Sequence, residues 1–489
     1  MLNLDQSIAE AEKSFQDILT YVQGDAQQQA LHEVERNIFS SLLKVGLNLL
    51  VVFIAKKGTG WIGKEHPGKD GAKLSYKRDR KVAYFSIFGK LDISRAYYYC
   101  FGQEGVFPLD KMLQLPERVY SYLLQDWVGQ FFVRDTFDSA LESLEKFLGF
   151  RLPKRSLEQV AQDASRDVEI FHEAQEIPEP ETEGKLLVVS VDCKGIPLVE
   201  PGNASGKVRL KKGEKRTKKK RATVSALYSI APQVRSAQDV LREVTEKKES
   251  AERVRPQNKK VWASLQGKEK VFQELQRDMK KRNSQERKPV VCLMDGERKL
   301  WEWQRIFFPM AICILDLYHV LEYLWKASHV FYPEGTKKAQ DWVTEHLRML
   351  LEGKIGYLIG GLEQSLTKRP LRGNKKKTLE GVIGYFKRNQ GYMQYDQYLA
   401  AGYPIGSGVV EGACRNLVKD RFERTGMRWT IEGAEAVLKL RAIYLNGNWN
   451  DFWDFHIHQE QERRFNHRSW EFLNRDKSSS DELVFKEAA

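Results

Sequence analysis

The chain has 489 residues, of which 42% are hydrophobic and 30% are charged, which is a globular composition sufficient for about three domains. Its net charge of +13, from 79 Lys and Arg against 66 Asp and Glu, favours a polyanionic partner such as nucleic acid. Five widely spaced cysteines fit reduced core thiols and argue against a disulfide framework or a Cys-x-x-Cys zinc site.

Apolar residues spaced through residues 1–57 predict helices. Residues 1–30 are polar and acidic, so we expect no secretory signal. The run Val45–Ala55 has 11 residues, against the roughly 20 needed to span a bilayer. We interpret this run as a buried helix and expect no membrane partner.

Residues 58–80 form a Gly-rich, basic segment that we interpret as a loop, and Val82–Tyr99 reads as a β-hairpin turning near Gly89. Leu115–Gln175 is helical again, with one helix ending at Gly149 and the next capped at Ser156. These two helices are a candidate helix-turn-helix, although helical hairpins are common in proteins that do not bind DNA. Residues 1–176 are therefore predicted as a mainly helical DNA-binding or dimerisation region with a β-hairpin.

The acidic, Pro-containing segment Glu176–Gly184 is the predicted main domain boundary. The apolar run Leu186–Val191 that follows is typical of a central strand and ends at Asp192. A carboxylate at a strand end is well placed to bind a metal, although aspartate is also a common turn residue.

The segment Lys207–Arg221 holds ten cations and one acid, Glu214. Such a tract cannot pack in a core, so we expect a mobile loop that neutralises DNA phosphates, with a merely solvated loop as the alternative. Ala222–Ala231 then reads as a strand, and residues 234–286 as helices. The candidate phosphate-binding residues of the tract are Lys211, Lys212, Lys215, Arg216, Lys218, Lys219, Lys220 and Arg221.

Two more apolar strands are each followed by an acid. Pro289–Met294 precedes Asp295, while Met310–Leu315 precedes Asp316 and, three residues later, His319. The repeated order of strand, acid and helix indicates an α/β sheet with acids gathered at strand ends. Residues 331–400 read as an all-α insertion between a first core segment, residues 184–330, and a second, residues 401–460.

The segment Ala401–Trp429 opens with a Gly/Pro/Ser turn, and a helix capped by Ser407 is expected to run from Val409 to Arg421. A Glu near a helix N-terminus is usually a dipole partner, but Glu411 here accompanies other isolated acids. The spacing places Glu411 on one helical face with two cations. The candidate phosphate-binding residues are Arg415, Lys419, Arg421, Arg424 and Arg428. The tail, residues 461–489, is charged, and His456 and His458 before it are interpreted as surface histidines.

Four motifs, VVSVDCKG, CLMDGERKLW, ILDLYHV and GYPIGSGVVEGACRNLVKDRFERTGMRW, resemble ISKra-type insertion-sequence transposases. These are similar to the Mutator and hAT groups of DDE transposases, and the resemblance covers about residues 35–460. It implies a ribonuclease-H-like catalytic core in a bacterial, cytoplasmic, nucleoid-associated enzyme. The enzyme would bind transposon ends and target DNA as a homodimer or higher oligomer, and would cleave and transfer DNA strands.

Carried over by motif, the resemblance implies that Asp192, Asp295 and Glu411 are the catalytic acids and the ligands of two Mg²⁺ or Mn²⁺ ions. Asp316 and His319 match a downstream Asp/Cys-x-x-His motif, and Asp316 competes with Asp295 as the second ligand. Relatives often carry paired cysteines near the position of Cys100, which lacks a close partner in sequence, so we expect no zinc module. A DNA-binding regulator without catalysis, and a nuclease without strand transfer, remain alternatives.

Overall fold

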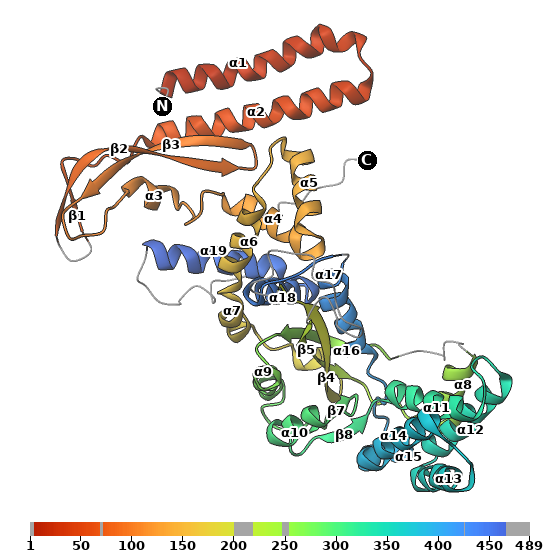
Figure 1. Ribbon diagram of the computed structural model, residues 1–489. Coiled ribbons are helices and arrows are strands. Elements are labelled where there is room, and N and C mark those ends of the chain that lie inside the picture. Colours follow the sequence, from red (N-terminus) through yellow and green to blue (C-terminus); the bar gives the residue numbers. More distant parts are fainter. Residues whose placement is uncertain (1–3, 69–71, 200–218, 247–253, 425, 466–489) are drawn as a thin grey trace. The chain divides into compact units, whose positions relative to one another are not determined.

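The computed structural model describes residues 4–68, 72–199, 219–246, 254–424 and 426–465 (Figure 1). The chain forms two compact units. The first comprises Met1–Val128, Leu141–Leu152 and Trp453–Ala489, and the second comprises Gly129–Ala140 and Pro153–Phe452.

The first unit begins with an antiparallel helical hairpin of α1 (Leu4–Gln23) and α2 (Leu31–Lys57), joined through a short 3₁₀ turn (Figure 1). A hydrogen bond between the Asn48 amide and Ser14 Oγ, 2.5 Å long, sets the register of the two helices. The helical prediction is therefore confirmed for residues 4–57, while residues 1–3 lie outside the described part of the chain.

A three-stranded antiparallel sheet follows, formed by β1 (Glu65–Pro67), β2 (Lys73–Ser86) and β3 (Gly89–Tyr99). Ser86 pairs with Gly89, so the predicted hairpin turn is confirmed. The prediction of a loop up to residue 80 is wrong, because β2 begins at Lys73. Its charged residues remain exposed, which a strand of an antiparallel sheet tolerates when one face lies in solvent.

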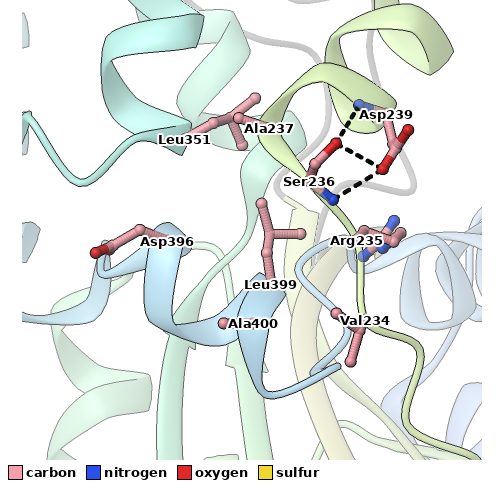
Figure 2. Close-up of a pocket in the computed structure, with 9 residues that line it drawn as sticks. All are labelled: Val234, Arg235, Ser236, Ala237, Asp239, Leu351, Asp396, Leu399 and Ala400. Atoms are coloured by element: carbon pink, nitrogen blue, oxygen red, sulfur yellow. Dashed lines mark hydrogen bonds between the residues drawn. The ribbon is translucent and has the colours of Figure 1, made fainter.

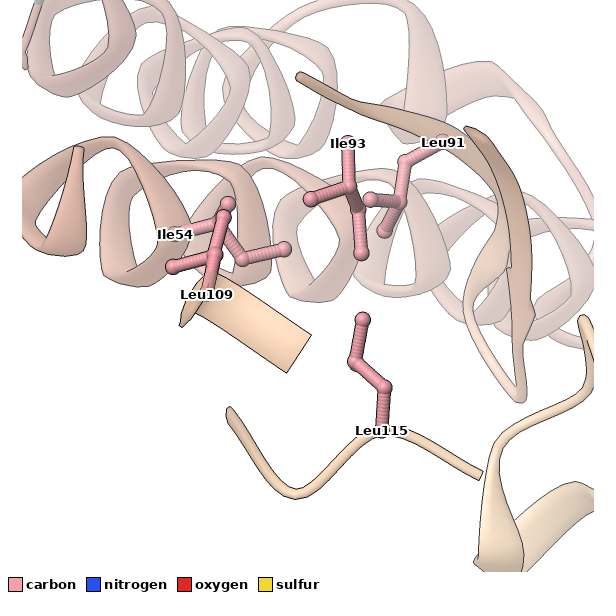
Figure 3. Packing of buried hydrophobic residues seen from close by; sticks show 5 residues of the cluster. All are labelled: Ile54, Leu91, Ile93, Leu109 and Leu115. Atoms are coloured by element: carbon pink, nitrogen blue, oxygen red, sulfur yellow. The ribbon is translucent and has the colours of Figure 1, made fainter. Parts of the chain in front are cut away.

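The core of the first unit brings together α2, β3 and the region of α3 (Pro108–Leu113). Figure 3 shows Ile54 of α2 beside Leu91 and Ile93 of β3, with Leu109 and Leu115 completing the cluster. Ile54 is the one buried residue of α2.

The interpretation of Val45–Ala55 as a buried helix is therefore wrong. One side of α2 packs against β3 and another against α1, but a third side is left open. By length and composition, α2 is also long and apolar enough to cross a membrane.

Four helices follow in sequence. They are α4 (Tyr122–Arg134), α5 (Phe137–Leu148), α6 (Lys154–Ser165) and α7 (Val168–Ala174). The predicted stop at Gly149 is confirmed, since α5 ends one residue earlier and Gly149 has a φ of 73°. The predicted cap is wrong: Pro153 occupies the N-cap of α6, and Ser156 lies inside the helix. Because most of α5 belongs to the first unit and α6 to the second, the candidate helix-turn-helix does not form one compact unit.

The second unit is built on a five-stranded mixed sheet in the order β6-β5-β4-β7-β8. The expected central strand is confirmed as β4 (Leu186–Pro197), which pairs antiparallel with β5 (Lys219–Ile230) and parallel with β7 (Val290–Met294). The edges are β6 (Gln257–Ser264), antiparallel to β5, and β8 (Ile312–Leu315), parallel to β7. This mixed α/β arrangement is compatible with a ribonuclease-H-like core.

Two sequence interpretations of this unit are corrected. Residues 234–286 are not all helical, because β6 lies between α8 (Ala237–Glu246) and α9 (Lys268–Arg282), and its polar first half hides the strand pattern. The predicted boundary Glu176–Gly184 lies within the second unit. There the buried Glu183 carboxylate pairs with Arg282 and, at 2.9 Å, with Lys288.

The segment that follows β8 is helical, as the sequence predicts, and its helices form a bundle (Figure 1). Its helices are α11 (Leu317–Phe331), α12 (Lys337–Leu351), α13 (Ile355–Lys368), α14 (Gly373–Asn389) and α15 (Tyr395–Ala400). The Tyr395 hydroxyl donates to the carbonyl of Leu315 at the end of β8 over 2.8 Å. The bundle is thereby attached to the edge of the sheet where the acids were predicted.

The remaining helices are α10 (Arg298–Phe307), α16 (Gly408–Ala413), α17 (Asp420–Phe422), α18 (Ile431–Leu445) and α19 (Trp449–Phe465). His456 on α19 is 1% exposed and its Nε2 lies 3.8 Å from a Glu460 carboxylate oxygen, so it is not a surface histidine.

Candidate metal centre

Asp192 and Asp295 lie side by side because their strands are parallel neighbours. Val191 pairs with Met294 in the last parallel pair between β4 and β7, and the two acids are the next residues. Asp192 is not at a strand end as predicted, since β4 continues to Pro197 through its pairing with β5. Asp295 does directly follow the end of β7.

Short-range bonds hold both carboxylates. The Asp192 Oδ1 atom accepts the backbone N–H of Cys193 at 2.5 Å, and the Cys414 thiol lies 3.3 Å from Oδ2. The Asp295 Oδ1 atom accepts the backbone N–H of Glu297 at 2.8 Å. Both side chains are partly accessible, so each can present oxygen atoms to a bound cation.

Asp316 is instead fully buried and bonded through both oxygens. It is the N-cap of α11, and its Oδ2 atom accepts the backbone N–H of His319 at 3.2 Å and lies 2.7 Å from His319 Nδ1. Its Oδ1 atom accepts the backbone N–H of Ser407 at 2.7 Å. Asp316 therefore ties the start of α11 to the turn before α16.

Glu411 approaches the same group from α16. Its Oε1 atom lies 3.3 Å from Ser407 Oγ, and the N-cap position predicted for Ser407 is confirmed. One ligand atom each from Glu411, Asp316 and His319 lies within 4.8 Å of the others, a spacing that suits one metal ion. Asp192 and Asp295 do not belong to this close trio, so the structure does not bring the three predicted acids into one equally tight set.

The predicted regular helix from Val409 to Arg421 is interrupted. After α16, residues Cys414–Lys419 form a π-helical stretch before α17. Such wide turns are rare and are frequent at functional sites. Arg441 on α18 donates from Nε to the Asn416 carbonyl within this stretch, at 2.8 Å. Because a π turn changes the angular spacing of side chains, the face predicted from regular helical periodicity does not extend through it.

The electrostatics show a site with excess negative charge. Burial raises the pKa of Asp295, and the neighbouring Asp192 carboxylate raises it further. Burial likewise raises the pKa of Glu411, with Asp316 adding to the effect. The hydrogen bond to Asp316 raises the pKa of His319 to about 9, assisted by the charges of Asp295 and Asp192. A protonated His319 therefore partly offsets the repulsion among four carboxylates.

The predicted basic tract is only partly described. Lys211, Lys212, Lys215, Arg216 and Lys218 lie outside the described residues. Lys219, Lys220 and Arg221 belong to strand β5 and not to a loop, which corrects the end of the predicted tract. Lys219 pairs with Glu423 and Arg221 with Glu297, both at 2.7 Å.

The candidate cations after Glu411 divide into exposed and buried residues. Arg415, Lys419 and Arg428 are exposed, and Arg424 pairs with Asp135. Arg421 is fully buried, which is opposite to the prediction of an exposed phosphate contact. Its Nε donates to the Phe132 carbonyl at 2.7 Å, its guanidinium lies 4.7 Å from the Trp429 ring centre, and burial lowers its pKa to about 9.

Sequence reasoning missed two residues that contact the acids, Cys414 and Tyr385. Cys414 lies next to Asp192 across a distance of 222 positions in the chain, and the Tyr385 hydroxyl donates to the Asp295 carbonyl at 2.8 Å. Cys414 is part of the motif that contains Glu411, but nothing in the sequence links it to Asp192. Tyr385 carries no sequence signal, because it reaches the site only through packing of the helical insertion.

A separate pocket of about 510 Å³ lies between the start of α8 and the ends of α12 and α15 (Figure 2). Ser236 and Asp239 are hydrogen-bonded to each other there, and Arg235 and Asp396 also line it. None of the residues lining this pocket belongs to the acidic centre, so the concave site and the candidate chemical site do not coincide.

No protein-family model and no curated protein matches this chain. A solved structure described as a Drosophila P element transposase strand transfer complex is similar over 70% of this chain and 81% of that chain, with 9% sequence identity and a TM-score of 0.23. A likeness this low does not identify a fold or an activity, so the chemistry of the site must carry a functional conclusion.

Proposed function

We propose that this chain is a DDE-type transposase that binds the ends of an insertion sequence and cleaves and transfers DNA strands, as its resemblance to ISKra-type enzymes implies. The observation that carries the proposal is the close trio of Asp316, His319 and Glu411. The Asp192 carboxylate acts electrostatically on both Asp295 and Glu411, which links the other two acids to the trio. A location in the bacterial cytoplasm, on the nucleoid, is part of the same proposal.

The donor set fits a hard divalent cation. Carboxylate oxygens are the ligands that Mg²⁺ and Mn²⁺ prefer. The pKa values of Asp295 and Glu411 are raised first by burial and then by neighbouring acids, and a bound cation would favour the charged form of both groups. Two bound ions would activate the attacking oxygen and stabilise the leaving oxygen of a phosphodiester. In this proposal Asp192, Asp295 and Glu411 supply the oxygens that hold them.

Hydrogen bonding favours Asp295 over Asp316 as the second ligand. Both oxygens of Asp316 already accept backbone N–H groups, and the side chain is fully buried. Asp295 accepts one backbone N–H and remains partly accessible. We therefore assign Asp295 as the ligand and Asp316 as the positioning residue that orients His319 and the turn at Ser407.

Strand cleavage of DNA carrying the element's own end tests the proposal. Wild type and Glu411→Gln are compared in Mg²⁺, Mn²⁺ and EDTA, with Asp341→Asn on α12 as a control because Asp341 is an exposed carboxylate outside the site. We expect metal-dependent cleavage by wild type and Asp341→Asn, and none by Glu411→Gln. Undiminished cleavage by Glu411→Gln would remove this residue from the site.

The same assay separates the two alternatives. Binding of the DNA end without cleavage in either metal would favour a regulator derived from a transposase. Cleavage without joining of the 3′ end to a second DNA would favour a ribonuclease-H-like nuclease.

A further inference from the structure

The helical hairpin of the first unit exposes a set of apolar side chains that the acidic centre does not explain. On α2 the exposed large apolar residues are Leu31, Phe39, Leu42, Leu49 and Phe53, and the spacings of 3, 7 and 4 residues between the last four follow the a/d positions of a heptad repeat. Leu49 is 56% exposed and Phe53 is 54% exposed. A soluble helix normally covers such a stripe.

The exposed residues of α1 extend the same face. Phe15 follows Ser14 by one position, and Leu49 on α2 likewise follows Asn48, the residue that bonds Ser14. Two antiparallel helices are related by an approximate two-fold axis. The residue that follows a contact residue therefore points to the same side of the hairpin on both helices, so Phe15 and Leu49 lie on one face. Ile8 and Leu19 are also exposed and occupy the same side of α1 as Phe15 by helical periodicity.

We infer that this face, defined by Ile8, Phe15 and Leu19 of α1 and Phe39, Leu42, Leu49 and Phe53 of α2, binds the same face of a second copy of the chain. Two hairpins would then form a four-helix interface with two-fold symmetry. Two packed helices of 20 and 27 residues present a face of roughly 30 by 20 Å. That area, about 600 Å², is about three quarters of the ~800 Å² that each partner buries in a stable interface of standard size.

The surroundings of α2 favour a second copy over a lipid bilayer. Leu47, Leu50 and Val51 on another side of α2 pack against the buried cluster that includes Leu91 and Ile93. α1, on the remaining side, exposes charged residues along its length. A bilayer would require these charges to enter hydrocarbon or α2 to leave its packing partners, whereas a matching hairpin covers the apolar face alone.

Sedimentation velocity of the full chain across the micromolar range, in EDTA and without DNA, tests the inference. We expect a wild-type dimer, and a dissociation constant raised at least about 100-fold by Leu49→Glu. Phe15→Glu on the other helix should have the same effect, because both residues belong to one face. Phe101→Glu is the matched control: Phe101 is 94% exposed, lies in the same unit and is outside the hairpin, so this variant should remain dimeric.

A monomeric wild type, or a Leu49→Glu variant as dimeric as wild type with an unchanged circular dichroism spectrum, would overturn the inference. So would a monomer that co-sediments with phosphatidylethanolamine–phosphatidylglycerol vesicles through Leu49, since that result would assign the face to a membrane. The assay contains neither metal nor DNA, so its outcome is independent of the cleavage test.

Discussion

The acidic centre of the second unit carries excess negative charge, whereas the apolar face of the first unit carries exposed hydrocarbon. The centre gathers four carboxylates, of which Asp295 and Glu411 have pKa values raised by burial and by neighbouring acids. The hairpin instead exposes aromatic and aliphatic side chains such as Phe15 and Leu49. Repulsion between charges is relieved by a cation, and exposed hydrocarbon by a matching apolar surface. The acidic centre is therefore expected to bind a cation, and the hairpin face to bind another apolar surface.

The largest expected effect separates a ligand from a positioning residue inside the acidic centre. Asp295→Asn should lower the rate of DNA strand cleavage by about 1000-fold or more and leave the melting temperature nearly unchanged. Asp316→Asn should lower the melting temperature, because its amide would place an N–H₂ group toward a backbone N–H or His319. Cleavage rate and thermal unfolding are measured on both proteins. The assignment is reversed if Asp295→Asn retains cleavage and Asp316→Asn loses it without losing stability.

A divalent cation should stabilise the second unit and not the hairpin. At a free Mn²⁺ concentration 100-fold above its dissociation constant, wild type should gain about 2.7 kcal/mol of unfolding free energy. Asp192→Asn should lose this gain, while the control Asp341→Asn keeps it. Thermal unfolding with and without Mn²⁺ gives the comparison, and an equal gain in the Asp192 variant would place the ion elsewhere.

In the segment that follows Glu411, the buried Arg421 should affect protein stability, whereas the exposed Arg428 should affect DNA binding. Arg421→Met should reduce the free energy of unfolding by about 1–3 kcal/mol, because it removes a buried hydrogen bond to the Phe132 carbonyl. Arg428→Gln should leave stability unchanged and reduce the salt dependence of DNA binding by about one phosphate contact. Urea unfolding and DNA titration at several salt concentrations test both. An altered salt dependence for a folded Arg421→Met protein would show that this residue reaches DNA after all.

The smallest expected effect is a pH dependence from His319, measured in EDTA. The folded-state pKa of His319 is raised from 6.5 to about 9 by its bond to Asp316, so the folded state binds the proton more tightly than the unfolded state. The stabilisation of the folded state by protonated His319 is complete below pH 6.5 and is lost as the pH rises through about 9. The unfolding free energy of wild type should fall across this window more than that of His319→Gln. Parallel pH profiles for the two proteins would contradict the assignment.

Local patterns were sufficient to predict the elements that carry the acids. Leu186–Val191 is apolar except for Ser190, and such a run is typical of a strand covered on both faces, as the centre of the sheet proved to be. The stop at Gly149 and the N-cap position of Ser407 are likewise local choices of backbone conformation.

Packing decided what those patterns could not. Arg421 looks like an exposed cation in sequence, yet it is buried because its guanidinium meets the Phe132 carbonyl and the Trp429 ring. Val45–Ala55 looks like a core helix, yet its intramolecular partners cover only part of its circumference. Both outcomes depend on contacts between distant segments, which periodicity along one segment does not contain.

The sequence by itself determined the strands that carry Asp192 and Asp295 and many of the helices, because backbone preference and hydrophobic periodicity act over a few neighbouring residues. Only the tertiary structure decided that Glu411 lies beside Asp316 and His319, that Cys414 contacts Asp192, and that one side of the hairpin stays open. The physical reason is that burial and charge–charge interaction depend on distance in space, and the chain sets those distances only when it packs.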